Sequence, residues 1–378
     1  MDIEFTEEQE LLRDSVQKML RADYASDARR AISRGESGFS RQHWRQFAEL
    51  GLLAAPLSEA AGGLGGGALA AMIVMEEFGR RLVVEPFFET VILAGGLLED
   101  AGSAQQRDQY LPKIMSGEAI WALAAFESRS RYDLAAVTTT AVPKDGGYLL
   151  RGKKAVVVGA PWADKLIVSA RTSGASGPDG ISLFIVDRNS ANLHLQSFKT
   201  IDGRRAADVT LDGVRAGSAD IIGREGRALE LMERMRIRAI AAQCAEALGA
   251  MGELNSATVE YCKTRKQFGV PLGSFQVLQH RMVDMFVALQ EATAITYLLN
   301  ATLAEEGPSC SRLAAATKAR VAEAARFVGE QAIQLHGGMG MTDELNVGHY
   351  FKRLLAINIQ FGDAAYHLTN FARMEEAA

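Results

Sequence analysis

Two glycine-containing segments in the last third of the chain carry residue types that bind phosphate-bearing ligands. The first runs from Arg265 to Gln276 and joins two predicted helices through an exposed turn. An arginine there can pair bidentately with a phosphate, and an amide at the start of the next helix can donate to it. On spacing alone, a charged helix end followed by a Gly-Pro turn is the simpler interpretation of this segment.

The second segment, from Gln334 to Thr342, closes a predicted helix with three glycines. A helix stop needs one glycine, whereas several allow a backbone to approach a ligand closely. His336 is a candidate ligand, although a histidine beside glycines is more often simply hydrogen-bonded. The surplus of glycine favours a binding function.

Other chemical motifs are excluded by their context. The run from Gly63 to Ala68 superficially matches a dinucleotide fingerprint, but a predicted helix precedes it where that motif needs a strand. It also lacks the Lys-Ser or Lys-Thr that follows a phosphate-binding loop. The six histidines and three cysteines show no metal-ligand spacing, so we predict no metal site and no disulfide.

The chain divides into three regions with different predicted secondary structure, and these regions must position the two segments. Residues 1–116 are helical in pattern and open with a capping box at Thr6 and Gln9. Residues 117–223 contain short β-branched runs separated by turns, typical of a small barrel or sandwich. Residues 224–378 contain long apolar-striped segments, among them 275–306, 311–335 and 345–374, which predict an antiparallel four-helix bundle. The fold class is therefore α+β.

Composition excludes several function classes. The 378 residues carry a formal net charge of −5, so no global positive field would hold a nucleic acid. The longest apolar runs are too short or too interrupted for the roughly 20 residues of a membrane span. The first ten residues lack the basic and apolar regions of a signal peptide. We expect a cytoplasmic protein with no membrane or nucleic-acid partner.

The two glycine-containing segments, with Gln279 and His280 added to the first, resemble the acyl-CoA dehydrogenase family. The resemblance runs end to end. It implies a helical N-terminal domain, a middle β-barrel domain, a C-terminal four-helix bundle, FAD as cofactor, and dimers or pairs of dimers. Three stretches most resemble the small subunits of pimeloyl-CoA dehydrogenases, namely residues 127–134, 261–286 and 334–353.

The family also implies a reaction and a shared cofactor site. A carboxylate removes the α-proton of an acyl-CoA thioester while the β-hydride passes to FAD, which bridges two subunits and later reduces an electron-transfer flavoprotein or a similar acceptor. By position, the resemblance assigns the diphosphate and adenosine half of that site to Arg265, Gln267, Phe268, Gln276, Gln334, Gly337 and Gly338.

The sequence departs from the family where the flavin ring and the base belong. The usual Thr-Glu-Pro segment reads Phe126-Glu127-Ser128, and the segment beside the ring reads Val156-Val157-Val158-Gly159. The two usual base positions align with Phe361 and Ala239. Loss of a general base removes a factor of roughly 10² to 10⁴ in rate, so these changes matter.

Two nearby carboxylates are candidate substitutes for the base. Asp363 lies two residues beyond Phe361, and Glu246 lies two helical turns from Ala239 and is the poorer candidate. Each also has a structural interpretation: Asp363 as the N-cap of a final helix, and Glu246 as a polar residue at a subunit contact.

Three hypotheses follow. In the first, the chain is the small subunit of a heteromeric acyl-CoA dehydrogenase, and a larger homologous partner supplies the base and the ring contacts. In the second, it is a self-sufficient homo-oligomer that uses Asp363 or another carboxylate as the base. In the third, it is a structural homologue without flavin.

Overall fold

The computed structural model describes residues 5–305 and 310–376, so Glu306, the predicted end of one bundle segment, lies outside the described residues. Its contacts divide the chain into two compact units. The bundle unit comprises Met1–Ala31, Ala68–Val83 and Ile240–Ala378. The sheet unit comprises Ile32–Gly67 and Val84–Ala239. Each unit is described by itself.

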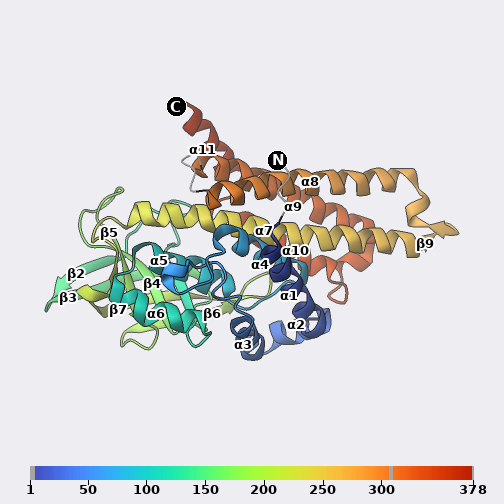
Figure 1. The fold of residues 1–378 in the computed structure, drawn as a ribbon. Helices are drawn as coiled ribbons and strands as arrows, with labels where there is room; N and C mark the ends of the chain where they lie inside the picture. The colour runs from blue at the N-terminus through green and yellow to red at the C-terminus, as the bar shows by residue number, and fades with distance from the viewer. Residues whose placement is uncertain (1–4, 306–309, 377–378) are drawn as a thin grey trace. The chain divides into compact units, whose positions relative to one another are not determined.

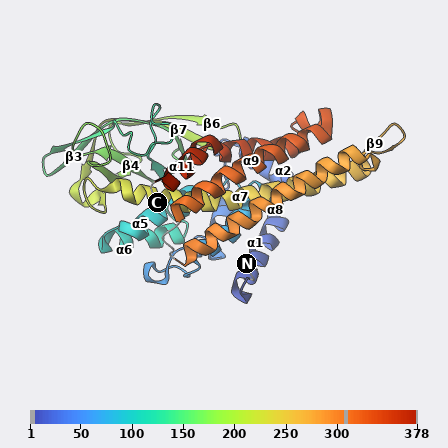
Figure 2. The ribbon, with the colours of Figure 1, turned by 90° about the horizontal axis from the view of Figure 1, so that it is seen from above.

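Long helices form the bundle unit (Figure 1). The predicted capping box is present: Thr6 accepts from Gln9 N, and Gln9 returns a bond to the Thr6 backbone. The helices are α1 (Glu7–Asp23), α4 (Gly67–Arg81), α7 (Ala228–Thr264), α8 (Gln276–Ala304), α9 (Cys310–His336), α10 (Val347–Ile359) and α11 (Ala364–Glu376). The first part of α7, residues 228–239, belongs to the sheet unit. Helix α9 packs against α8, α10 and α11. In both views α7, α8 and α9 run alongside one another, and a hairpin of β9 (Lys266–Gln267) and β10 (Val270–Pro271) projects where α7 and α8 join (Figures 1 and 2).

The pattern over residues 345–374 predicts one final helix, and the structure has two. Helix α10 ends at Ile359 and α11 begins at Ala364. Between them Phe361 has a φ of 58° and Gly362 a φ of 117°, values that a right-handed helix does not contain. A β-carbon on Gly362 would lie 2.4 Å from the imidazole of His367, so this turn requires glycine.

Two glycines allow α4 and α7 to cross at backbone contact. A β-carbon on Gly249 would lie 1.8 Å from the carbonyl oxygen of Glu76, and one on Gly79 would lie 1.9 Å from that of Glu246. Real side chains never approach so closely. The packing of these two helices therefore depends on the absence of both side chains.

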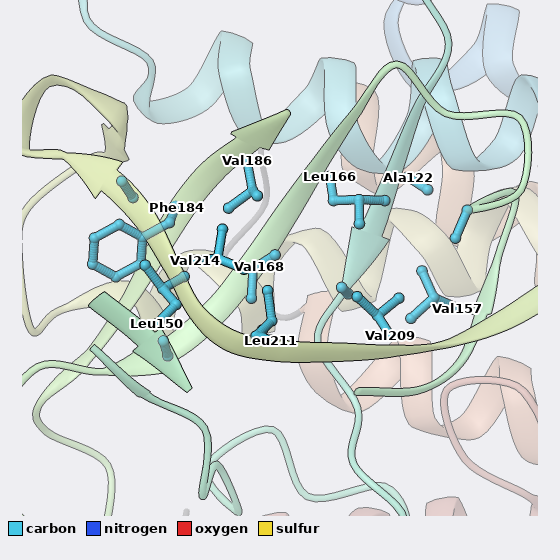
Figure 3. Packing of buried hydrophobic residues seen from close by; sticks show 14 of the residues in the cluster. Ala122, Leu150, Val157, Leu166, Val168, Phe184, Val186, Val209, Leu211 and Val214 are labelled. Atoms are coloured by element: carbon cyan, nitrogen blue, oxygen red, sulfur yellow. The ribbon is translucent and has the colours of Figure 1, made fainter. Parts of the chain in front are cut away.

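An eight-stranded sheet dominates the sheet unit, in the order β6-β7-β3-β2-β4-β5-β8 with β1 paired to β4. Apolar side chains from several strands meet over it, including Leu150, Val168, Phe184 and Leu211 (Figure 3). The strands are β1 (Trp121–Ala124), β2 (Thr140–Lys144), β3 (Gly147–Val158), β4 (Lys165–Arg171), β5 (Ile181–Asp187), β6 (Leu193–Lys199), β7 (Arg205–Gly217) and β8 (Ile221–Ile222).

Shorter helices complete the sheet unit. They are α3 (Arg41–Glu49), a π-helix (Phe88–Gly95), α5 (Gly96–Ala101) and α6 (Ala104–Met115), while α2 (Ser26–Arg34) spans the boundary between the units. Strands β1 and β6 escape sequence prediction. The buried β1 is rich in alanine, and most residues of β6 are exposed, so neither shows a β-branched run.

Among the described helices, α8 is the one that is long and apolar enough to cross a membrane, and 28% of its most apolar stretch is buried. Helix α9 packs along it. We interpret α8 as a helix of the bundle.

Replacement of Gly249 by alanine tests the crossing of α4 and α7. We expect Gly249→Ala to lower the free energy of unfolding by about 1–3 kcal/mol or more, because the new methyl group meets main-chain atoms. Gly252→Ala on the same helix is the control: its methyl would approach only the flexible end of Arg80, and alanine favours helix by about 1 kcal/mol. Urea unfolding monitored by circular dichroism measures both. Equal stability of the two variants would contradict the crossing.

Candidate functional site

A groove of about 640 Å³ lies on the bundle unit where α7, α8 and α9 end or begin. Five of the seven residues predicted to bind nucleotide line it, although they come from segments about seventy positions apart. They are Arg265, Gln267, Gln334, Gly337 and Gly338. The fold therefore brings the two glycine-containing segments into one site.

The charge in this groove has one sign. Arg265 and Arg281 are lining residues, and no acidic side chain is among the described residues that line it. Arg281 donates to Gln331 Oε1 at 2.7 Å, which orients its guanidinium. A groove with two guanidinium groups and no carboxylate suits a diphosphate.

The glycines leave space in the groove. A β-carbon added to Gly337 or to Gly338 would meet no heavy atom within 4 Å. Packing within the described chain therefore does not demand glycine at Gly338, and at Gly337 the demand comes only from its φ of 60°. The open space admits a ligand at van der Waals distance from the backbone.

Gln276 and Phe268 do not line the groove, but both border it. Gln276 is the first residue of α8, whose N-cap residue Phe275 makes no side-chain cap, so this helix end can receive an anion. Phe268 occupies the turn between β9 and β10 with a φ of 54° and is 92% exposed. A bulky residue in that conformation is strained, so its exposure suggests contact with another molecule.

Neither of the two usual base positions of the family holds a carboxylate in this chain. Ala239 on α7 is fully buried in the sheet unit. Phe361 in the α10–α11 connection is 8% exposed, and its carbonyl accepts from His367 Nε2 at 2.9 Å. Apolar side chains therefore fill both positions.

Glu246 is committed to a buried ion pair. Its two carboxylate oxygens accept from Arg353 Nε at 2.7 Å and from a terminal nitrogen of Arg353 at 2.6 Å. The two residues are 1% and 3% exposed. A bidentate guanidinium stabilises the ionised carboxylate and occupies both oxygens, which makes Glu246 a poor proton acceptor.

The α10–α11 connection is held by polar contacts to other helices. Asp363 Oδ1 accepts from Tyr366 N at 2.8 Å, the bond of an N-cap for α11. Gln243 on α7 donates to Gln360, and the buried Lys318 on α9 donates to the carbonyl of Ile357 near the end of α10. Burial lowers the pKa of Lys318 to about 8. These bonds fix the connection in place.

In the sheet unit, Glu127 anchors the segment that precedes β2. Its carboxylate accepts from the backbone and hydroxyl groups of Thr138 and Thr139 and from Lys154 Nζ at 2.8 Å. Lys154 is fully buried and also donates to Ser169 Oγ at 2.9 Å. Although burial opposes it, the Lys154 ammonium with these hydrogen bonds lowers the pKa of Glu127 to about 2. These bonds therefore hold the loop in place, although Phe126 lacks the hydroxyl of the threonine that is usual at this position.

The segment aligned with the flavin ring has few donors to offer. The N–H groups of Ala155, Val156 and Gly159 already donate to Phe126 O, Asp208 Oδ1 and Arg205 O. Val157 and Val158 pair with Ala207 and Ala206 of β7. Val156 sits in a bulge of β3 with a φ of 52° and is 56% exposed. This segment presents hydrocarbon where a ring would need hydrogen bonds.

Sequence reasoning did not assign Tyr261 and Arg281 to the site, and both line the groove. Helical spacing could have identified Tyr261, which lies four residues before Arg265. Arg281 lies five residues after Gln276 and therefore on a different face of the helix, so helical spacing does not identify it.

Family models match the chain in three successive stretches. The acyl-CoA dehydrogenase N-terminal domain matches residues 6–118, the middle domain residues 122–214 and the C-terminal domain residues 226–375. The chain belongs to the acyl-CoA dehydrogenase family.

Individual acyl-CoA dehydrogenase relatives agree with that membership. The mitochondrial isovaleryl-CoA dehydrogenase of Arabidopsis thaliana is 30% identical over 92% of this chain and 86% of its own length. Acryloyl-CoA reductase (NADH) of Anaerotignum propionicum is 28% identical over 99% of this chain and 95% of its own. The solved structure of a Tcur3481-Tcur3483 steroid ACAD variant is 31% identical with a TM-score of 0.88, covering 98% of each chain.

Membership in the acyl-CoA dehydrogenase family implies FAD, and the described residues fit one half of that cofactor. The bundle groove offers guanidinium groups, amides and open glycine backbone, which suit a diphosphate and an adenosine. The segment from Val156 to Gly159 and Phe126 offer the isoalloxazine ring no side-chain hydrogen bond, because their side chains are hydrocarbon or, at Gly159, absent.

The depressed pKa of Glu127 predicts a pH dependence of stability. Folding lowers this pKa from 4.5 to about 2, so the stabilisation is complete above about pH 4.5 and is lost as the pH falls from 4.5 to 2. Glu127→Gln should lower the free energy of unfolding by about 1–3 kcal/mol at pH 6. Between pH 5 and 3, the free energy of unfolding should decrease less for this variant than for the unaltered protein. Urea midpoints that fall in parallel for both proteins would contradict this.

The buried pair of Glu246 and Arg353 predicts a double-mutant result. Glu246→Ala leaves an uncompensated buried guanidinium and should cost about 3–5 kcal/mol. The double variant Glu246→Leu with Arg353→Met replaces both charges by apolar groups and should recover most of that loss. Urea unfolding of the single and double variants tests this, and additive losses would show that the two groups do not interact.

Proposed function

We propose that this chain is a subunit of a heteromeric, FAD-dependent acyl-CoA dehydrogenase. This chain contributes the residues that bind the diphosphate and adenosine of FAD. A homologous larger subunit contributes the residues that contact the flavin ring and the catalytic base. Bound FAD would accept the hydride from the β-carbon of an acyl-CoA thioester. The electrons would then pass to an electron-transfer flavoprotein or a similar acceptor.

One contrast carries this proposal. The bundle groove holds two arginines, two amides and open glycines, while the base positions hold Phe361 and Ala239. Glu246 is paired with Arg353, and Asp363 caps α11. A complete enzyme needs both kinds of site, and this contrast supports a second chain as the source of the missing groups.

The surface of α8 supports a partner chain. Val277, Val283, Phe286 and Val287 lie exposed on this helix, and Phe268 projects from the hairpin beside its start. Exposed apolar side chains on one helix are typical of a protein interface. Val277 also lines the groove, which supports an interface beside the nucleotide half-site.

Relatives support the two-subunit assembly. The solved relative at 31% identity is named by two gene products and called a steroid ACAD. The stretches around Glu127, Arg265 and Gln334 resemble the small subunits of pimeloyl-CoA dehydrogenases, which supports a dicarboxylic or otherwise long acyl group. In a heteromer that acyl group would bind beside the base of the partner.

Flavin stoichiometry tests the assembly. We expect the purified chain to hold little flavin, and a mixture with a homologue that has Thr-Glu-Pro and a base glutamate to hold one FAD per pair of chains. Arg265→Gln should weaken FAD binding by the mixture about 10-fold or more, because it removes a charge-assisted pair with the diphosphate. The control Arg326→Gln alters an exposed arginine paired with Glu330. Visible absorption measures each occupancy, and a fully active, stoichiometrically yellow single chain would refute the proposal.

Asp363 distinguishes the heteromer from a self-sufficient enzyme. Asparagine caps helices about as well as aspartate, so Asp363→Asn should leave folding intact. In the proposed heteromer we expect turnover within about twofold of the unaltered complex. A loss of roughly 10² to 10⁴ in kcat with unchanged flavin absorption would instead make Asp363 the base.

A further inference from the structure

His336 lies in the wall of the nucleotide groove, although neither the predicted site nor the proposed function uses it. It is the last residue of α9 and is 5% exposed. Its ring stacks on that of Tyr261 from α7, with centroids 4.3 Å apart and planes 27° from parallel. The hydroxyl of Tyr261 also reaches the His336 carbonyl at 3.4 Å. The imidazole is therefore held in place from two sides.

Hydrogen bonding fixes which ring nitrogen can change its proton. Nδ1 of His336 lies 2.8 Å from the carbonyl oxygen of Ala332. A carbonyl only accepts, so Nδ1 carries a hydrogen in the neutral and in the charged ring. Nε2 is then the nitrogen that gains or loses a proton.

The charged and titratable groups around His336 favour the neutral ring while the groove contains only protein. Burial lowers the pKa of His336. The groove brings Arg265 from the end of α7, Arg281 from α8 and the Tyr261 phenol, and none of its described lining residues is acidic. No described carboxylate in the groove therefore stabilises an imidazolium.

A bound diphosphate reverses that balance. It brings two negative charges into a groove whose described lining has none, and an opposite charge favours the charged form of a histidine. The Tyr261 ring adds a second stabilising contact, because a cation over an aromatic face is attracted by the ring. Both contacts act on the imidazolium more strongly than on the neutral ring.

We propose that His336 binds the nucleotide diphosphate as an imidazolium, and that Nε2 takes up a proton from solvent when the nucleotide enters. This rests on the proposed function in one respect, namely that the groove holds a nucleotide diphosphate. It assigns to His336 a share of the binding that Arg265 and Arg281 would otherwise provide.

Calorimetry with ADP-ribose tests the proposal on the full chain. The diphosphate diester of this probe keeps its two charges between pH 6 and 8.5, so any net proton uptake belongs to the protein. Titrations at pH 6.5 in two buffers of different ionisation enthalpy give that uptake. We expect up to about half a proton per site, and binding several-fold weaker at pH 8.5 than at pH 6, since a pKa rise of about one unit limits the ratio to tenfold.

Matched variants complete the experiment. His336→Gln should bind ADP-ribose without proton uptake and without the pH dependence, whereas the exposed His280→Gln should behave as the unaltered chain. Should His336→Gln fail to fold, the ring resonance of His336 in the unaltered chain gives its pKa directly, and we expect that pKa to rise on saturation with ADP-ribose. Binding without uptake or a pKa rise overturns the role of His336 and leaves the groove as a nucleotide site. If ADP-ribose binds neither this chain alone nor its mixture with the partner homologue, the nucleotide site and the role of His336 are both overturned.

Discussion

A carboxylate in the packed bundle cannot remain ionised without a partner, and this constraint decides what the described residues can do. Glu246 satisfies it through the two donors of Arg353, which join α7 to α10. The pair therefore serves the fold, and the oxygens that could have accepted a substrate proton are already occupied. Phe361, in the connection after α10, satisfies the same constraint by carrying no charge.

The charged side chains in the groove of the bundle unit, unlike Glu246, have no partner of opposite charge among the described lining residues. Arg265 and Arg281 lie there without an acidic neighbour among the described lining residues, and the glycine backbone leaves space that the protein does not fill. Positive charge at a surface groove is tolerable because water solvates it until an anion arrives. In the sheet unit, by contrast, Glu127 and Lys154 form an ion pair with each other, which holds the loop in place.

Sequence alone predicted much of this molecule, for physical reasons. The capping box at Thr6 and the apolar stripe of α7 are local patterns, and each has its expected structure. The break before Asp363 and the strand β6 depend on neighbours distant in the chain, so periodicity missed them. The groove residues were found through a resemblance, whereas Arg281 became visible only when folding brought its helix beside η5 (Gly337–Met341).

The hairpin between α7 and α8 has a consequence for the newly made chain. It holds Phe268 almost wholly in water, on a turn that a phenylalanine adopts only under strain. An exposed apolar side chain of this kind can associate non-specifically with other apolar surfaces, including those of unfolded proteins. If the proposed heteromer forms, aggregation of this polypeptide is most favourable in the interval between synthesis and assembly. Its abundance in the cell should follow the supply of whatever covers that ring.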